Sequence, residues 1–288
     1  MHYEGNIIRP PSEADSIILQ VTVGCSHNKC IFCGAYKNIL FNIKSDEIIN
    51  KDIKFAAQYC RRQNTVFLAD GDALIIPQKR LIDIFSRIRE KLTWVKRIRL
   101  YGNAKSILRK SPEDLADLKQ LGLDRIYMGL ESGSDSVLTF LKKGSNAEKM
   151  IEGGKRVREA GIFLSVTVLL GIAGRENSEE HAISTGKVLS AMQPNQIAAL
   201  TLMLLPNTEI YTLEKENKFT LLNSRELLAE LRILVDHITS RGQFHTNHAS
   251  NYLPINGRLP KDKDAILAKI DQALAGNFSL TPEYLRAL

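Results

Sequence analysis

The stretch that decides the fold runs from residue 17 to residue 33 and reads IILQVTVGCSHNKCIFC. Its first part, residues 17–23, is rich in β-branched residues and predicts a strand. Cys25, Cys30 and Cys33 then follow within nine residues. Three thiolates on one short loop suit a cofactor with several metal atoms, because each sulfur can bind a different iron. No fourth ligand is obvious nearby, so one metal would keep an open position for chemistry.

Zinc is the alternative for this loop, with His27 or the remote Cys60 as fourth ligand. Disulfides are disfavoured, because the chain is large, has only four cysteines and shows no secretory pattern. Cys60 falls at helical spacing with Ile49, Ile53 and Ala56. This spacing predicts that Cys60 packs as a small buried hydrophobic residue and is not a ligand.

Length and composition indicate one substantial core. The chain has 288 residues, of which 44% are hydrophobic and 25% charged, as is ordinary for a globular protein. No apolar stretch reaches transmembrane length and the first residues lack a signal pattern, which predicts a cytoplasmic protein without a membrane partner. The net charge of +7 mildly favours an anionic substrate or partner, and leaves a nucleic acid open as a partner, but the charges are dispersed.

Strand-like and helix-like segments alternate along most of the chain. The expected strands are 17–23, 65–69, 97–102, 125–130, 162–169 and 197–204, and the expected helices between them are 45–62, 78–92, 111–121, 146–160 and 178–192. Ser111-Pro112-Glu113-Asp114 carries the signals of a helix start, and Gly122 and Gly161 stand where helices should end. Six successive βα steps predict an α/β fold with a parallel sheet, as a partial (β/α)6 TIM-like barrel.

After residue 205 the pattern changes. Helices are expected near 223–239 and 261–275, on either side of an irregular polar and aromatic segment, residues 244–254. We expect residues 1–210 to form the barrel core with an N-terminal lead-in. Residues 211–288 should form a mostly helical C-terminal extension that packs on this core and is not an independent domain.

In several expected strands every second residue is polar, which is unusual for parallel strands buried on both faces. The polar positions are Gln20 and Thr22, then Arg97, Arg99, Tyr101 and Asn103, then Ser165 and Thr167. A barrel interior filled only by side chains would favour Val, Ile and Leu. The pattern therefore predicts an interior that holds a ligand.

Together, the cysteine loop, its place after the first strand and the six βα units resemble the radical S-adenosylmethionine (SAM) superfamily. Members usually carry C-x3-C-x2-C with an aromatic residue before the third cysteine. This chain has Phe32 at that place but four residues between Cys25 and Cys30. Residues 129–138 and 205–208 resemble the methylthiotransferase-like and oxygen-independent coproporphyrinogen-oxidase-like branches.

The resemblance implies roles for further residues. Asp70, Gly71 and Asp72 occupy the place of the segment that meets the SAM amino group, where glycine permits close approach and a carboxylate accepts from an ammonium. Glu131 would contact SAM, Lys143 would neutralise its carboxylate, and Ser165 could reach the ribose. The cofactor-binding set that the resemblance implies consists of Phe32, Asp70, Gly71, Asp72, Asn103, Glu131, Lys143 and Ser165.

By the same resemblance, Cys25, Cys30 and Cys33 would hold three irons of an oxygen-sensitive [4Fe–4S] cluster, and SAM would bind the fourth. The implied activity is reductive cleavage of SAM to a 5′-deoxyadenosyl radical that acts on an unknown, most simply small-molecule, substrate. A reductant such as flavodoxin or ferredoxin would supply the electron. Two alternatives stay open: an iron–sulfur electron-transfer or binding protein without SAM turnover, and a zinc-supported barrel hydrolase.

The substrate-facing residues are the least defined part of the prediction. The segment from Phe244 to Tyr252 follows neither helix nor strand periodicity, and irregular segments on a rigid scaffold often carry function. Its His245 and His248 could move a proton near neutral pH or bind an anion. Together with Tyr101 they are the catalytic candidates, and an ordinary connecting loop is the alternative.

Overall fold

The structure is a computed structural model that describes residues 1–287. The chain divides into two compact units, and each is described by itself. Unit 1 contains residues 1–28, 35–128 and 156–164, and unit 2 contains residues 29–34, 129–155 and 165–287. Strand β6 (Leu123–Glu131) and strand β7 (Phe163–Leu170) each contribute residues to both units.

Unit 1 is built on parallel strands. β1 (Ile17–Gln20) pairs with β4 (Thr65–Ala69), β4 pairs with β5 (Arg97–Tyr101), and β5 pairs with the first part of β6. All five residues of β4 are buried, as expected for a strand with neighbours on both edges and side chains covered on both faces. The chain therefore presents the carboxyl ends of these strands at one edge.

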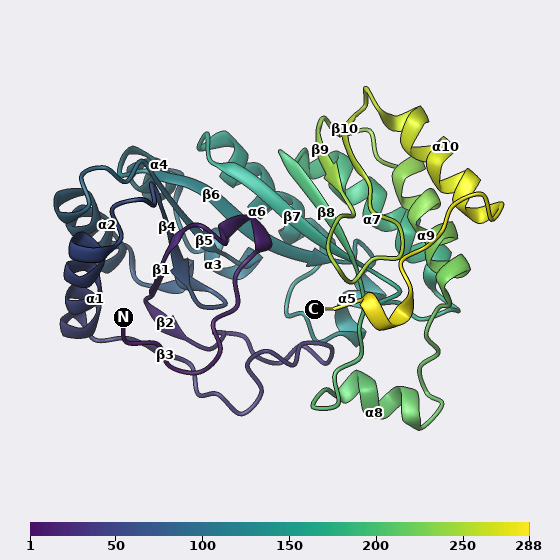
Figure 1. Ribbon diagram of the computed structural model, residues 1–288, viewed down its shortest axis with the longest axis horizontal. Helices are drawn as coiled ribbons and strands as arrows, with labels where there is room; N and C mark the ends of the chain where they lie inside the picture. Colours follow the sequence, from purple (N-terminus) through teal and green to yellow (C-terminus); the bar gives the residue numbers. More distant parts are fainter. Residues whose placement is uncertain (288) are drawn as a thin grey trace. The chain divides into compact units, whose positions relative to one another are not determined.

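The helices of unit 1 bury one apolar stripe each. Helix α1 (Asp46–Tyr59) and helix α2 (Gln78–Lys91) lie side by side (Figure 1), and α2 buries Leu81, Ile84, Phe85 and Ile88. The short helix α3 (Ala104–Leu108) follows β5, and α4 (Pro112–Gln120) follows α3. α4 begins with the predicted capping box, since Ser111 accepts from the Asp114 amide and the Asp114 side chain accepts from the Ser111 amide.

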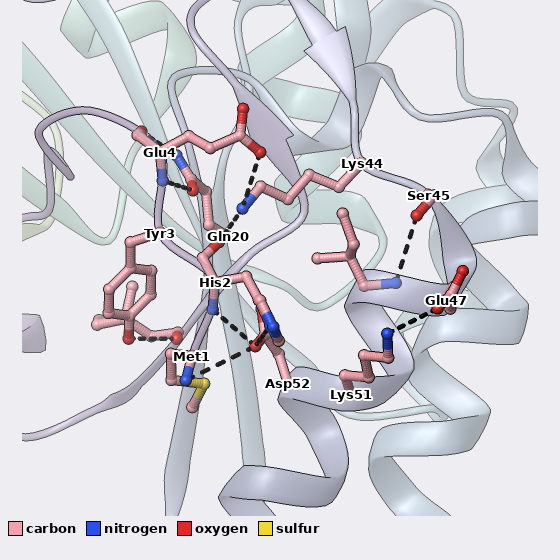
Figure 2. A network of polar contacts seen from close by, with 12 residues as sticks. Met1, His2, Tyr3, Glu4, Gln20, Lys44, Ser45, Glu47, Lys51 and Asp52 are labelled. Carbon is pink, nitrogen blue, oxygen red and sulfur yellow. Dashed lines mark hydrogen bonds and ion pairs between the residues drawn. The ribbon is translucent and has the colours of Figure 1, made fainter.

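The N-terminal residues are tied to the parallel strands by a polar network, drawn in Figure 2. The buried carboxylate of Asp52 accepts from the His2 amide at 2.8 Å and lies 2.8 Å from the His2 ring. Lys44 donates to the His2 carbonyl and lies 3.4 Å from Glu4. Farther along the chain, the short helix η1 (Pro11–Glu13) buries Glu13, which pairs with Arg99 at 2.9 Å.

Unit 2 continues the parallel arrangement. β7 pairs with β8 (Gln196–Thr201), and β8 pairs with β9 (Gly242–His245), both in parallel; β9 then pairs antiparallel with β10 (Asn256–Leu259). Helix α7 (Ser178–Met192) connects β7 to β8. Helix α9 (Ser224–Asp236) packs against α7 and against α10 (Lys263–Leu274), as Figure 1 also shows. The C-terminal extension thus shares a unit with β8.

Several shorter elements complete the described chain. They are β2 (Thr22–Val23), β3 (Asn42–Ile43), η2 (Ala73–Ile75), α5 (Asp135–Phe140), α6 (Ala147–Glu159), α8 (Glu209–Lys215) and η3 (Glu283–Leu285). No helix among the described residues has the length and apolar character needed to span a membrane.

The predicted α/β fold class with a TIM-like partial barrel is confirmed, and the predicted elements agree closely with the observed ones. The predicted strand 17–23 is wrong in one respect. The chain leaves β1 at Val21, and residues 22–23 pair with β3 in a separate two-stranded sheet. The expected domain boundary at residue 210 stays a prediction.

Two further expectations are corrected. Phe244 and His245 are not irregular but lie in β9, because parallel pairing with β8 outweighs the weak periodicity of this segment. Cys60 is partly exposed and not buried, because α1 ends at Tyr59 and Cys60 is its C-cap, turned off the buried helix face.

Candidate active site

In unit 1, the first cysteine lies against the acidic segment that follows β4. The amide of Gly71 donates to the Gly24 carbonyl at 3.2 Å. A Cβ atom at position 71 would lie 2.7 Å from Tyr36 Cε2 and 3.1 Å from Cys25 Cβ. Only glycine therefore permits this approach of Tyr36 and Cys25. The predicted contact of Gly71 with SAM stays a prediction.

Asp72 is buried, and only one of its two carboxylate oxygens accepts hydrogen bonds from the described residues. Its Oδ2 accepts from Ser26 Oγ at 2.5 Å and from Asn103 Nδ2 at 2.8 Å, while its Oδ1 has no hydrogen-bond partner among the described residues. Burial raises the pKa of Asp72, because the charged form loses its hydration. A bound cation would compensate this buried carboxylate.

The Asp70 carboxylate is oriented by Gln20 of strand β1. Gln20 Nε2 donates to Asp70 Oδ2 at 2.7 Å and to the Glu4 carbonyl at 2.9 Å, which connects the N-terminal network to this segment. The Asp70 amide donates to Thr22 Oγ1 at 2.9 Å. Burial again raises the pKa of Asp70. Two of the polar strand positions, Gln20 and Thr22, therefore orient this acidic segment.

In unit 2, the other two cysteines flank a buried anchor. Ile31 is fully buried; its amide donates to the Leu141 carbonyl at 3.1 Å, and its carbonyl accepts from the Ile210 amide at 3.1 Å. Asn207 Nδ2 donates to the Gly34 carbonyl at 2.9 Å just after the last cysteine. These contacts fix the backbone on both sides of Cys30 and Cys33, whose side chains are partly exposed.

Glu131 and Lys143 form an ion pair in unit 2. Lys143 Nζ donates to Glu131 Oε1 at 2.8 Å and lies 6.0 Å from the centre of the Phe32 ring. Both charged side chains are largely buried, with exposed fractions of 12% for Lys143 and 10% for Glu131. Three of the predicted cofactor-binding residues are thus neighbours.

Glu131 has an unusual backbone. Its φ is +63°, and the Ser132 amide donates to the Leu130 carbonyl at 2.8 Å, which closes a tight turn around Glu131. A non-glycine residue rarely adopts this conformation, and such strain persists only where the surroundings enforce it. The turn directs the Glu131 side chain toward Lys143 at the end of β6.

Ser165 lies apart from these residues. It stands near the start of β7, and its hydroxyl donates to Gln196 Oε1 on β8 at 3.2 Å. The ribose contact of Ser165 stays a prediction.

The three catalytic candidates have different surroundings. Tyr101 packs edge-on against Phe67, at 5.2 Å between ring centres, and burial raises the pKa of its hydroxyl. The His245 ring lies 2.7 Å from Asn256 Oδ1 of β10. His248 Nδ1 accepts from the Ser250 amide at 3.1 Å, and burial lowers the pKa of the ring. Their predicted roles remain predictions.

Contacts within unit 1 explain some of the polar residues at alternate positions of β5. Arg99 pairs with Glu13 at 2.9 Å and with Asp124 at 3.0 Å, and Tyr127 donates to Glu13. The lead-in helix η1 therefore neutralises Arg99 within unit 1. Arg97 is exposed. These arginines do not need a ligand to satisfy their charge.

The arrangement of possible ligands distinguishes a site for a single metal ion from a site for an iron–sulfur cluster. Among residues 1–287, no three His, Cys, Asp or Glu side chains gather closely enough to hold a single ion. A [4Fe–4S] cluster needs a different arrangement, in which each thiolate binds its own iron. Unit 1 supplies Cys25 and an unpaired oxygen of Asp72 that suits an ammonium, and unit 2 supplies Cys30, Cys33 and a cation, Lys143, that suits a carboxylate. These are the kinds of group that such a cluster with SAM needs.

Sequence reasoning missed the residues that support these groups. Ser26 and Gln20 orient the two aspartates, and Ile31 anchors the cysteine loop. Polar residues beside a motif carry no distinguishing pattern in a single sequence. Only the alternation in β1 indicated Gln20.

The comparisons with known proteins identify the family of this chain. The family model of the Radical SAM superfamily matches residues 19–185, more than half of the chain. The chain therefore belongs to the radical SAM superfamily. The cofactors of this family are a [4Fe–4S] cluster and SAM.

Two curated relatives are similar over much of the chain. The heme chaperone HemW of Bacillus subtilis is 22% identical over 233 residues, which cover 79% of this chain and 59% of that protein. An uncharacterized methyltransferase of Pyrococcus horikoshii is 24% identical over 173 residues, 57% of this chain and 35% of its own length. The matched regions thus span only part of each relative.

Solved structures share the fold. Coproporphyrinogen III oxidase (HemN) from Escherichia coli has a TM-score of 0.57 at 14% identity, covering 77% of this chain and 51% of that one. Methylornithine synthase (PylB) has a TM-score of 0.55 at 15% identity, covering 77% and 63%. The methyltransferase TsrM from Kitasatospora setae has a TM-score of 0.58 at 18% identity, covering 69% and 38%.

Proposed function

We propose that this chain reductively cleaves SAM at a [4Fe–4S] cluster bound by Cys25, Cys30 and Cys33. The observation that carries the proposal is the position of Cys25 directly against Gly71, between two buried aspartates that each have one oxygen without a hydrogen-bond partner among the described residues. When bound, the reduced cluster and SAM supply a 5′-deoxyadenosyl radical for hydrogen abstraction or addition.

The protein's own residues would bind and orient SAM. Asp72 and Asp70 would accept from its ammonium, with Asn103 and Gln20 fixing the carboxylates. Lys143 would bind the carboxylate of SAM and keep its ion pair with Glu131. Phe32, whose ring centre lies 6.0 Å from Lys143 Nζ, would help to exclude water from the bound SAM. A ribose contact from Ser165 completes the proposed set.

The substrate, the reductant and the location of the chemistry belong to the proposal too. A small molecule, which the net charge of +7 favours as an anion, would bind near Tyr101, His245 or His248. A flavodoxin or ferredoxin would supply the electron in the cytoplasm. We place the barrel core at residues 1–210 and treat 211–288 as an extension of it.

The test is anaerobic reconstitution with iron and sulfide, followed by dithionite, SAM and chromatography for 5′-deoxyadenosine. The wild type should form 5′-deoxyadenosine. Replacing Cys25, Cys30 or Cys33 by alanine should abolish it, because each thiolate binds a separate iron.

The matched control is Cys60→Ala, which changes the remaining cysteine and should leave the product yield at the wild-type level. Loss of product in Cys60→Ala, with retention in Cys33→Ala, would contradict the ligand assignment.

A second candidate is a haem-related role, favoured by the similarity to the heme chaperone HemW over 79% of this chain. It predicts that haemin titrated into the protein gives a saturable shift of the Soret absorption band. A spectrum that stays equal to that of free haemin throughout the titration would remove this candidate. The SAM assay is independent of that result.

A further inference from the structure

A fully buried polar chain runs through unit 2 from the C-terminal extension toward Glu131. Glu230 on α9 is 1% exposed and His181 on α7 is 2% exposed. Glu230 Oε1 lies 3.7 Å from His181 Nε2, and His181 Nδ1 lies 2.8 Å from Ser132 Oγ. Ser132 is the residue after Glu131.

Glu230 also holds the turn after β7. The Gly171 amide donates to Glu230 Oε1 at 2.6 Å, and Ser178 Oγ donates to Glu230 Oε2. Strand β7 ends at Leu170, and Gly171, the next residue, turns the chain with a φ of +78°. One carboxylate therefore contacts the turn after β7, the first residue of α7 and the α7 histidine.

The backbone after Glu131 is anchored on the same helix. The Gly133 amide donates to Thr185 Oγ1 at 2.8 Å, and the Ser134 amide donates to Ser132 Oγ at 3.1 Å. A Cβ atom at position 133 would collide with the Ser184 carbonyl of α7. The segment is thus pressed against α7 with its polar groups satisfied.

This arrangement explains how the strained turn at Glu131 persists. A non-glycine residue such as Glu131, with φ of +63°, is strained and needs contacts that enforce its conformation. The hydroxyl of Ser132 lies 2.8 Å from His181 Nδ1, so the orientation of the imidazole affects that of Ser132. The groups that orient His181 are Glu230 and the Leu169 carbonyl on one side and Thr185 on the other.

We propose that Glu230 is a positioning residue for the SAM site: through Gly171 it fixes the turn after β7, and through His181 and Ser132 it fixes the turn that presents Glu131. The inference rests on the proposed function, in which Glu131 and Lys143 bind SAM. It assigns to helix α9 of the C-terminal extension a direct part in shaping the site.

The test compares Glu230→Gln with Asp236→Asn, which neutralises an exposed carboxylate on the same helix. The first measurement is amide hydrogen exchange without SAM. Glu230→Gln should accelerate exchange on the order of tenfold in peptides covering residues 130–134 and 169–173, because local opening becomes easier there. Peptides of α10, and all peptides of Asp236→Asn, should exchange at wild-type rates.

The second measurement is SAM affinity by calorimetry on the anaerobically reconstituted protein. Glu230→Gln and Ser132→Ala should each weaken binding about fivefold, and the double variant should be no weaker than the worse single variant, because both act through one chain. Independent effects in the double variant, or exchange that rises evenly across unit 2, would overturn the proposal. If the wild type does not bind SAM, the proposed function fails, and the exchange experiment still decides whether Glu230 positions the two turns.

Discussion

At the scale of single residues, Asp72 shows how function and stability oppose each other. The carboxylate is fully buried, accepts two hydrogen bonds on Oδ2 and leaves Oδ1 unpaired among the described residues. Burying such a charge without a cation is unfavourable. A site prepared for the ammonium of SAM has this property before the ligand binds.

Asp72→Asn should therefore weaken SAM binding at least about tenfold, since the charge-assisted hydrogen bond to the ammonium is lost. The same variant should unfold at an equal or higher temperature than the wild type, because a buried uncompensated charge is removed. Calorimetry and thermal unfolding check the two parts. Asp83→Asn on α2 is the control. Unchanged SAM affinity in Asp72→Asn would remove this residue from the site.

At the scale of elements, the sequence predicted helix ends correctly where the capping residues are close together in the sequence. Ser111, Pro112 and Asp114 predicted the start of α4, and the structure has the complete capping box there. Gly122 and Gly161 end helices with φ of +105° and +69°. The short helix α3 was missed, because it is held by the Asn103 cap and has too few residues to show a period.

Ser111→Ala should lower the free energy of unfolding by about 1 kcal/mol, because the Asp114 amide loses its acceptor at the start of α4. Urea unfolding measures this difference. Ser279→Ala, at an exposed position outside the helices, should change it by less than about 0.5 kcal/mol. Equal effects in both variants would mean that the cap contributes nothing.

The pair on α7 and α9 gives a prediction about pH. Burial raises the pKa of Glu230 from 4.5 to about 7 and lowers the pKa of His181 from 6.5 to about 4. Between pH 4.5 and 7 the folded chain retains a proton on Glu230 that the unfolded chain has lost, so stability falls as pH rises. Between pH 4 and 6.5 the unfolded chain binds a proton on His181 that the folded chain does not, so stability rises with pH.

In the wild type these two contributions nearly cancel between pH 4.5 and 6.5. Relative to the wild type, Glu230→Gln should therefore show a free energy of unfolding that rises with pH in this range, and His181→Gln one that falls. At about 1.4 kcal/mol per pH unit, each slope is measurable by urea unfolding at pH 5.0 and 6.0. Slopes of the same sign in both variants would contradict the assignment.

At the scale of the whole molecule, the sequence predicted the α/β class and most elements, because six buried strands and amphipathic helices have clear periods. The strands β9 and β10 were not predicted, because they are short and depend on pairing with β8. The sequence indicated the candidate site only through the residues of its motifs, and their roles stay predictions. Ser26, His181 and Glu230 were not indicated, since their roles arise from contacts between segments distant in sequence.

The central claim is that SAM binds at the cluster held by Cys25, Cys30 and Cys33. Electron paramagnetic resonance of the reduced, reconstituted protein with and without SAM tests it most directly, because a ligand on the open iron changes the electronic structure of the cluster. The account predicts a new spectrum on addition of SAM, and the same change in Cys60→Ala. A cluster signal that is identical with and without saturating SAM would contradict it, and would indicate an iron–sulfur protein that does not use SAM.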